Sequence, residues 1–371
     1  MAKTLLITGG AGFIGSHLAD ELLRSGYRVR VLDALDPQVH GEDRKRPDYL
    51  DPAVELVRGD VRDAEAVADA LRGVDAVYHF AGRVGVGQSM YRIGDYVGIN
   101  DLGTAVLLEA LILRPVKRLV VASSMSVYGE GLYRDAEGRA IEVAERDPEH
   151  LRAGEWEPRR NGGLLTPMPT SETCTPRLAS VYALSKFVQE RLCLIIGRAY
   201  GIPTVALRFF NTYGPRQALS NPYTGVLANF ATRLLNGRPP LIYEDGRQRR
   251  DFVHVGDVAV ACRLALEVPE AAGEVFNIAS GRSVTVSEAA QRLAEILCQR
   301  HIEPEITGRC RVGDIRHCFA DIAQARAVLG YEPRIPLEKG LEDLAGWLAS
   351  QHSEDRMDEA SRELALRGLS A

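Results

Sequence analysis

Short runs of consecutive apolar residues alternate with stretches of helical periodicity through the first half of the chain. Runs that stay apolar on both sides of the backbone are typical of strands buried on both faces of a parallel sheet. Six such strands are predicted, at residues 4–8, 28–32, 54–58, 76–80, 118–123 and 204–209. With helices in the gaps, this order predicts an α/β fold built on a doubly wound parallel sheet.

Two later regions depart from this alternation. Residues from about 130 to 177 form a polar insertion, which could be a lid, a dimer contact or a surface excursion. After Pro215 the pattern predicts helices at 226–236, 257–267 and 287–300, with a strand and turn at 241–246. We therefore expect a sheet domain at 1–210, a smaller mixed α/β C-terminal lobe at 211–345 and a helical tail at 346–371. The chain could return to the sheet around 250–260.

The composition is that of an ordinary globular protein. Lys and Arg total 45 against 50 Asp and Glu, without a basic block, so nucleic acid is not an expected partner. The six cysteines are scattered without a C-x-x-C pair, which favours reduced, packed thiols over disulfides or a metal site. No secretion signal and no uncharged apolar run of about 18 to 20 residues is visible. We expect a cytoplasmic protein with no metal and no membrane contact.

A glycine-rich turn follows the first strand and leads into a predicted helix. Gly9, Gly12 and Gly15 stand at its first, fourth and seventh places, with Phe13 and Ile14 between the last two. Such glycines permit a tight turn and close backbone approach, while the helix N-terminus offers free N–H groups to a pyrophosphate. The turn therefore predicts dinucleotide binding on a Rossmann-type sheet.

Asp33, at the end of the second strand, bears on the choice of dinucleotide. Its distance from Gly15 along the chain is close to the spacing at which an acidic residue binds the adenosine ribose hydroxyls. A carboxylate there repels a 2′-phosphate, which favours NAD over NADP. Two alternatives stay open: Asp33 could be a simple turn residue, and the basic cluster Arg44, Lys45 and Arg46 could contradict the choice of NAD if its loop folds back.

Two further strand ends carry residues suited to a dinucleotide. The third strand leads to Asp60 and Val61, and the fourth leads to Phe80, Ala81 and Gly82. Open α/β sheets bind ligands at the carboxyl ends of their strands. We expect Asp60 to meet the adenine edge and residues 80–82 to let the cofactor pass close to the backbone, although small residues are equally compatible with packing.

Candidate catalytic side chains lie at the end of the fifth strand and at the start of a long predicted helix. Ser123 and Ser124 stand at the end of the strand, and Tyr182 and Lys186 are four residues apart, which places both on one helix face. Lys186 could hold the cofactor ribose while its charge lowers the pKa of Tyr182, so that the phenol acts as a base at neutral pH. Ser124 could relay the proton.

Together these pieces resemble the extended short-chain dehydrogenase/reductases, specifically the NAD-dependent nucleotide-sugar epimerase/dehydratase family. The resemblance covers most of the chain from residue 4 to about 340. It rests also on Asn100 with Gly103 and Thr104; on Val127, Tyr128 and Gly129; on Arg208, Phe209, Phe210, Asn211, Tyr213, Gly214 and Pro215; on Arg250, Asp251, Phe252, Val253, His254, Val255 and Asp257; and on Arg311, Gly313, Asp314 and Ile315. It implies NAD as the cofactor, a nucleotide-sugar substrate and a homodimer.

The resemblance implies further site residues. To the cofactor site it adds Asn100, Ser123 and Phe209. To the substrate it assigns Ser124, Met125, Ser126, Asn211, Arg250, Arg311 and Asp314. Asn211, Arg250 and Arg311 should bind the substrate pyrophosphate, because guanidinium and amide groups donate well to phosphate oxygens. The C-terminal lobe is then the substrate-binding part, although a surface salt bridge is the alternative for each arginine.

The residues after Ser124 bear on the reaction. Dehydratases of this family place an Asp-Glu pair there, whereas this chain has Met125 and Ser126, which disfavours dehydration. The resemblance then implies 4-epimerisation of a dTDP- or UDP-linked hexose through a 4-keto intermediate. Val84 stands where relatives specialised for UDP-galactose often carry Lys, and the insertion resembles that of 4-epimerases of dTDP-linked 6-deoxy sugars such as dTDP-L-rhamnose. A nucleotide-sugar reductase, a uronic acid decarboxylase and a non-catalytic NAD-binding sensor are the alternatives.

Overall fold

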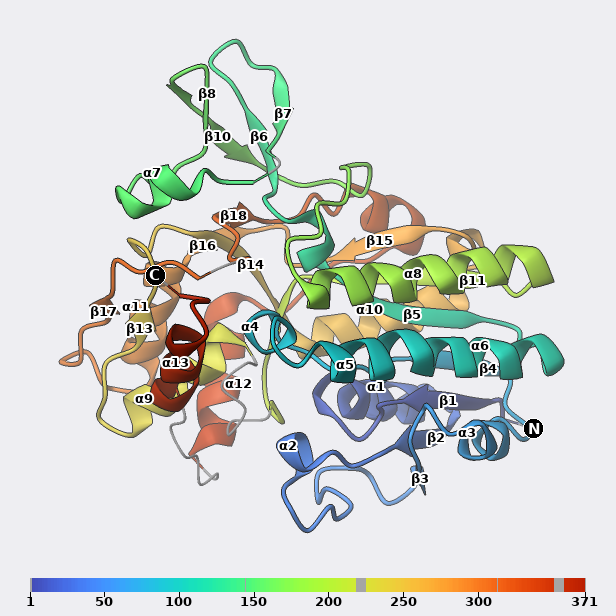
Figure 1. The fold of residues 1–371 in the computed structure, drawn as a ribbon. Coiled ribbons are helices and arrows are strands. Elements are labelled where there is room, and N and C mark those ends of the chain that lie inside the picture. The colour runs from blue at the N-terminus through green and yellow to red at the C-terminus, as the bar shows by residue number, and fades with distance from the viewer. Residues whose placement is uncertain (1, 144, 218–224, 312, 350–356, 371) are drawn as a thin grey trace.

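A parallel sheet of seven strands forms the core of the molecule, in the order β15-β11-β5-β4-β1-β2-β3 (Figure 1). The computed structural model describes residues 2–143, 145–217, 225–311, 313–349 and 357–370. The strands of this sheet are β1 (Thr4–Thr8), β2 (Arg28–Asp33), β3 (Glu55–Arg58), β4 (Ala76–His79), β5 (Leu119–Ser124), β11 (Thr204–Phe209) and β15 (Val275–Ile278). Each neighbouring pair is parallel. The predicted fold class is confirmed.

The strand order reverses on either side of β1, which pairs with β2 on one edge and with β4 on the other. Such a reversal opens a crevice at the carboxyl ends of the strands, where open α/β sheets bind ligands. All six predicted strands are present with small shifts at their ends. β5 extends to Ser124, so this serine is the last residue of the strand. Within the seven-stranded sheet, the sequence pattern missed only β15.

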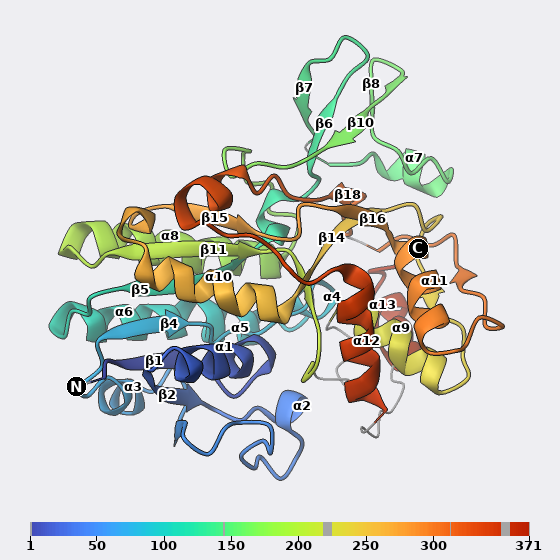
Figure 2. The same ribbon diagram turned by 180° about the vertical axis from the view of Figure 1, so that it is seen from behind.

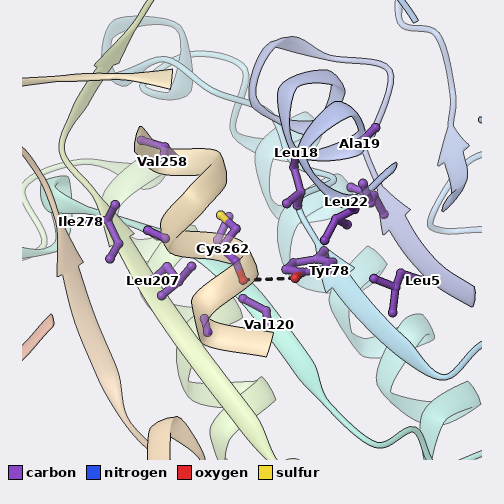
Figure 3. Packing of buried hydrophobic residues seen from close by; sticks show 14 of the residues in the cluster. Leu5, Leu18, Ala19, Leu22, Tyr78, Val120, Leu207, Val258, Cys262 and Ile278 are labelled. Carbon is purple, nitrogen blue, oxygen red and sulfur yellow. Dashed lines mark hydrogen bonds between the residues drawn. The ribbon is translucent and has the colours of Figure 1, made fainter. Parts of the chain in front are cut away.

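Helices cover both faces of the sheet (Figures 1 and 2). One face carries α1 (Phe13–Arg24) and α10 (Val255–Glu267), and the other carries α3 (Ala64–Ala70), α6 (Gly103–Leu113) and α8 (Val181–Tyr200). Figure 3 shows Leu18 and Leu22 of α1 beside Val258 and Cys262 of α10, where the Tyr78 hydroxyl donates to the Cys262 carbonyl at 3.1 Å. The predicted lobe helix at 257–267 therefore lies on the sheet, because its apolar face is buried there.

Shorter elements connect the sheet to its helices. They are α2 (Pro37–His40), α4 (Val86–Ser89), α5 (Ile93–Tyr96), the π-helix η1 (Val97–Leu102), the 3-10 helices η2 (Met125–Tyr128) and η3 (Pro269–Ala271), and the π-helix η4 (Ala325–Leu329). By length and composition, the stretch Ile93–Leu113 is the one helical segment of the described residues apolar enough to cross a membrane. Leu107, Leu108 and Leu111 of this stretch pack in the core beside the sheet.

The smaller lobe has its own core and small sheets. Its helices are α9 (Val226–Leu235), α11 (Val286–Ile296), α12 (Leu337–Leu348) and α13 (Met357–Leu366), and its strands are β12 (Asn211–Tyr213), β13 (Leu241–Ile242), β14 (Arg249–His254), β16 (Ser283–Thr285), β17 (Glu305–Ile306) and β18 (His317–Cys318). The strand and turn predicted at 241–246 are present, with the strand at Leu241–Ile242 and a turn in which Glu244 has a φ of +55°. Residues 350–356 of the predicted tail lie outside the described residues.

The insertion is an ordered subdomain that projects from the body of the molecule (Figure 1). Its elements are β6 (Leu132–Arg134), β7 (Ala140–Glu142), α7 (Pro148–Arg152), β8 (Arg159–Arg160), β9 (Gly163–Leu164) and β10 (Thr166–Met168). Buried ion pairs join it to the lobe. The Arg316 side chain, 0% exposed, binds Glu157 of the insertion and Glu244 of the lobe, while Arg146 of the insertion binds Glu130 and Glu244. The insertion thus braces the segment that contains Arg311 and Asp314.

Candidate active site

The glycine-rich turn joins β1 to α1 and packs against the end of β4. Gly9 has a φ of +70°, and a Cβ atom there would lie 2.8 Å from the backbone nitrogen of Ala81. A Cβ on Gly15 would lie 2.6 Å from the Cα of Gly10. Gly12 begins α1 without a side-chain cap, and the first turn, which includes Phe13 and Ile14, holds no acidic residue. Backbone N–H groups at this helix N-terminus are therefore well placed for a pyrophosphate.

Asp33 lies at the end of β2 and contacts the glycine-rich turn. Its carboxylate accepts hydrogen bonds from the backbone N–H groups of Ala11 at 3.0 Å and Leu35 at 2.8 Å. Burial raises the pKa of this carboxyl group, and the two backbone hydrogen bonds offset part of that rise. Asp33 is therefore more than a turn residue, because it also fixes the loop that would hold a dinucleotide.

The basic cluster after β2 has partners of its own. The Arg44 side chain donates to the carbonyl of Leu35, and Lys45 pairs with Asp43 at 2.9 Å. The Arg46 guanidinium donates to backbone carbonyls within its own loop. The loop of this cluster thus folds back as far as Leu35, two residues after Asp33, while the Asp33 carboxylate itself contacts the glycine-rich turn.

Residues predicted at the other strand ends gather at the same edge of the sheet. Asp60, the residue before Val61, forms an ion pair with Arg62 at 2.7 Å. The rings of Phe80 and Phe209 meet edge to face with centroids 5.7 Å apart. Asp60 follows β3, Phe80 follows β4 and Phe209 ends β11, so the structure places these predicted cofactor residues at the carboxyl edge of the sheet.

Asn100 links the segment after β4 to α8. It is 0% exposed, accepts the backbone N–H of Arg83 at 2.6 Å and donates to the Ser185 hydroxyl at 2.8 Å. A Cβ atom on Gly82 would lie 3.2 Å from the amide oxygen of Asn100. A larger residue at position 82 would therefore require Asn100 to shift. Asn100 therefore fixes the segment that contains Arg83 against α8.

Tyr182 lies in the first turn of α8 and is held from three sides. Its backbone N–H donates to the Ser89 hydroxyl at 3.0 Å, and its ring meets that of Tyr96 edge to face. Its hydroxyl forms a hydrogen bond with Ser124. Ser124 in turn accepts from the Ser126 backbone N–H at 3.2 Å and the Ser126 hydroxyl at 2.9 Å. With both acceptor positions filled, the hydroxyl proton of Ser124 is directed to the phenol.

The protonation of Tyr182 and Lys186 differs from the expectation in one respect. Burial raises the pKa of Tyr182, and the hydrogen bond with Ser124 offsets part of that rise. Burial lowers the pKa of Lys186 to about 8. The predicted lowering of the Tyr182 pKa by Lys186 is not seen, since burial and Ser124 are the groups that act on this phenol. The Lys186 ammonium group donates to the Oε1 of Gln189 at 2.6 Å.

Ser123 belongs to a buried polar cluster behind the site. Its hydroxyl donates to Glu190 at 2.7 Å, and Glu190 forms a two-point ion pair with Arg208. The Arg208 guanidinium lies over the ring of Tyr128, with 4.9 Å to the ring centroid. The side chain of Ser123 is thus occupied, so that a cofactor contact at this residue falls to its backbone.

The predicted substrate residues of the lobe lie on adjacent strands and on one loop. Asn211 of β12 has a buried Oδ1 without a hydrogen-bond partner among the described residues. Arg250 of the neighbouring β14 donates to the carbonyls of Ile315 and Arg316. A buried acceptor without a partner in the described part of the chain, such as the Oδ1 of Asn211, is costly unless a ligand or water donates to it.

Arg311 and Asp314 lie in the segment that precedes Ile315 and Arg316, and their side chains contact each other. Their side chains pair at 2.9 Å, and the Arg311 guanidinium lies 4.3 Å from the ring centroid of Tyr243. The backbone of Arg311 also pairs with Ser370 near the end of the chain. A phosphate at Arg311 would therefore share this guanidinium with Asp314. Met125 occupies the 3-10 turn after Ser124 and is largely buried.

Sequence reasoning missed Gln189, Ser89 and Tyr96, which contact Lys186 or Tyr182. Gln189 follows Lys186 by three residues and so shares its helix face, which was the available signal. Ser89 and Tyr96 lie far from Tyr182 in the sequence, so no spacing rule could have paired them.

The chain was compared with known proteins. The family model described as the NAD dependent epimerase/dehydratase family matches residues 5–150 and 162–279. The dTDP-L-rhamnose 4-epimerase of Burkholderia thailandensis is 35% identical over 354 residues, 94% of this chain and 96% of that protein.

Solved structures are similar over the same length. The UDP-glucose 4-epimerase of Thermotoga maritima, in complex with UDP-glucose, has a TM-score of 0.76 and 31% identity, covering 93% of this chain and 98% of that one. The UDP-glucuronic acid 4-epimerase of Bacillus cereus, in complex with UDP-glucuronic acid and NAD, has a TM-score of 0.77 and 27% identity, covering 94% and 100%. The match thus extends from the glycine-rich turn through the Ser124–Tyr182 pair to the lobe, and this chain belongs to the NAD dependent epimerase/dehydratase family.

Proposed function

We propose that this chain is a 4-epimerase of a dTDP- or UDP-linked hexose that works through a transient 4-keto sugar. The observation that carries the proposal is the position of Tyr182 beside Ser124, the last residue of β5 at the carboxyl edge of the sheet, where Ser124 lowers the pKa of the phenol against the effect of burial. Because Ser126 fills the acceptor positions of Ser124, the serine donates to the phenolate and stabilises it. Tyr182 is then the base that removes the hydroxyl proton at carbon four and later returns it.

NAD is the cofactor in this proposal. When bound, it accepts a hydride from the sugar carbon and returns it to the opposite face of the keto sugar. The turn at Gly9, Gly12 and Gly15 holds the pyrophosphate, and Asp33 binds the adenosine ribose. Lys186 binds the nicotinamide ribose, and Asp60 and the residues at 80–82 line the remaining path.

The substrate diphosphate lies between the lobe and the sheet edge. Asn211 can support this assignment through its Nδ2, which can donate to a phosphate oxygen, whereas its buried Oδ1, without a partner among the described residues, can accept only from a hydroxyl, an N–H group or water. Arg250 and Arg311 supply the charge, with Asp314 orienting Arg311. The relationship to a dTDP-L-rhamnose 4-epimerase favours a dTDP-linked 6-deoxyhexose as the first substrate to test.

Met125 separates epimerisation from dehydration. Loss of water needs an acid and a base at neighbouring carbons, and the largely buried thioether of Met125 supplies neither. A nucleotide-sugar reductase or uronic acid decarboxylase of the same family is the second candidate. A non-catalytic NAD-binding sensor would have no need of the Ser124 and Tyr182 hydrogen bond.

The test is a panel of dTDP- and UDP-sugars incubated with purified protein and no added cofactor. We expect one sugar to interconvert with its 4-epimer without change of mass, and Tyr182→Phe to abolish the conversion. Strict dependence on added NADPH would instead identify a reductase, and loss of carbon dioxide a decarboxylase.

We propose that the chain acts as a cytoplasmic homodimer. Leu184 and Ile195 are eleven residues apart on α8, so they share one helix face, and their side chains are exposed, as are Val97 and Leu102 of η1. All six cysteines are free, which suits a reducing compartment, although Cys298 is exposed rather than packed as predicted. Light scattering on the purified protein distinguishes a dimer from a monomer.

A further inference from the structure

We propose that Gln189 is a positioning residue that aims the Lys186 ammonium group at the cofactor ribose. This inference rests on the proposed function, in which Lys186 binds that ribose. Lys186 is 5% exposed, and its Nζ donates to the Oε1 of Gln189 at 2.6 Å. A lysine side chain has four rotatable carbons, so a fixed acceptor one helical turn away restricts where its charge lies.

Gln189 is itself fixed by a buried polar cluster, here called the Gln189 cluster, which comprises Gln189, Thr104, His79, Ala81 and Thr8. The side chain of Gln189 is 0% exposed. Its Nε2 donates to the Thr104 hydroxyl at 3.0 Å and to the Ala81 carbonyl at 3.3 Å, and lies 3.3 Å from Nε2 of His79. The other ring nitrogen of His79 lies 2.8 Å from the Thr8 hydroxyl.

The members of the cluster come from four different elements. Thr8 ends β1, just before the glycine-rich turn, and Ala81 follows β4, where the crevice opens. Thr104 lies in α6, and Gln189 lies in α8 beside Lys186. The orientation of the ammonium group is thus tied directly to the two strand ends that form the crevice, rather than to α8 alone.

An amide suits this position electrostatically. Burial lowers the pKa of Lys186 to about 8, while Cys193, Glu190 and Asp101 act in the opposite direction. His79 faces the same ammonium, and burial together with that charge lowers the pKa of His79 to about 3, so the ring is neutral. An amide oxygen stabilises the charged lysine without adding a negative charge that would compete with the ribose hydroxyls.

The decisive variant is Gln189→Met, which keeps the size and removes the acceptor. We expect its affinity for NAD to fall about tenfold, since a charge-assisted hydrogen bond is no longer correctly aimed. We also expect the alkaline loss of NAD affinity to begin at a lower pH, because Lys186 without its acceptor loses its proton more easily. Gln189→Glu restores an acceptor oxygen and should move that alkaline limit above the wild-type value.

Ile196→Ala is the matched control, because Ile196 packs against the same face of the sheet from α8 without touching Lys186. It should lower the midpoint of thermal unfolding while leaving the pH dependence of NAD affinity unchanged. Fluorescence titration of NAD from pH 6 to 10 provides the readout and requires no sugar substrate.

The outcomes separate the two proposals. If the wild-type protein converts no nucleotide sugar but Gln189→Met still shifts the pH dependence of NAD affinity, the epimerase proposal fails and the positioning role stands. If folded Gln189→Met binds NAD with the wild-type affinity and pH dependence, the positioning role is wrong whatever reaction the enzyme catalyses.

Discussion

The carboxylate of Asp33 accepts a hydrogen bond from the backbone N–H of Ala11, 3.0 Å away, inside the glycine-rich turn. One side chain therefore both shapes the turn and presents negative charge where the adenosine ribose would bind. The selectivity for a dinucleotide and the conformation of its binding loop are coupled through this one group.

Asp33→Asn tests this coupling, since the amide oxygen can still accept from Ala11 while the charge is removed. We expect NAD affinity to fall, and the preference for NAD over NADP to narrow by about tenfold, because a buried carboxylate no longer repels the 2′-phosphate. Fluorescence titrations with both dinucleotides measure this ratio. An unchanged ratio would show that Asp33 acts on the loop alone.

Ser124→Ala should reduce kcat by about 100-fold and move the acidic limb of the pH profile to higher pH. Burial already raises the pKa of Tyr182, and the hydrogen bond from Ser124 counteracts it, so its loss raises that pKa further. The phenol would then lose its proton only at higher pH. Ser126→Ala should have a smaller effect in the same direction. Identical pH profiles for wild type and Ser124→Ala would contradict the assigned role.

Arg316 should be the most costly arginine to remove from the lobe. Arg316→Met leaves Glu157, Glu244 and Asp245 without their shared cation, and should lower the free energy of unfolding by about 3 kcal/mol. Arg139→Met is the control, because it removes an exposed ion pair with Asp135 and should change the free energy of unfolding by less than about 1 kcal/mol. Urea denaturation compares the two, and equal costs would refute a brace at Arg316.

The insertion should detach from the lobe in acid. Burial tends to raise the pKa of Glu157, but hydrogen bonds from His317 and Arg316 outweigh it and bring the value down to about 2. A lowered carboxyl pKa contributes stability that is present above the pKa of the unfolded chain and is lost as pH falls through the folded value. Hydrogen exchange in residues 130–177 should therefore increase between about pH 4.5 and pH 2, and Glu157→Gln should weaken this pH dependence.

The parallel sheet was predictable because each of its first six strands is a run of apolar residues with clear ends. The same pattern failed at β15, whose four residues come after a helix that the sequence assigned to the lobe. The glycine-rich turn, Asp33, Ser124, Tyr182 and Lys186 were found because motif spacing along one or two elements identifies them.

Contacts between distant segments could not be found in this way. Gln189 meets Ala81 across more than a hundred residues of sequence, and Arg316 meets Glu157 of the insertion across a similar distance. Both pairs depend on how helices and loops pack in three dimensions. No periodicity encodes that packing, and the sequence offered only one signal for these residues, the three-residue spacing that places Gln189 on the same helix face as Lys186.

The most direct test of the central claim is conversion of the nucleotide sugar in deuterated water without added cofactor. If Tyr182 exchanges the hydroxyl proton while a bound dinucleotide takes and returns the carbon hydride, the 4-epimer must form without deuterium on any sugar carbon. Stable deuterium on carbon, or no conversion until a reduced dinucleotide is supplied, would contradict the account.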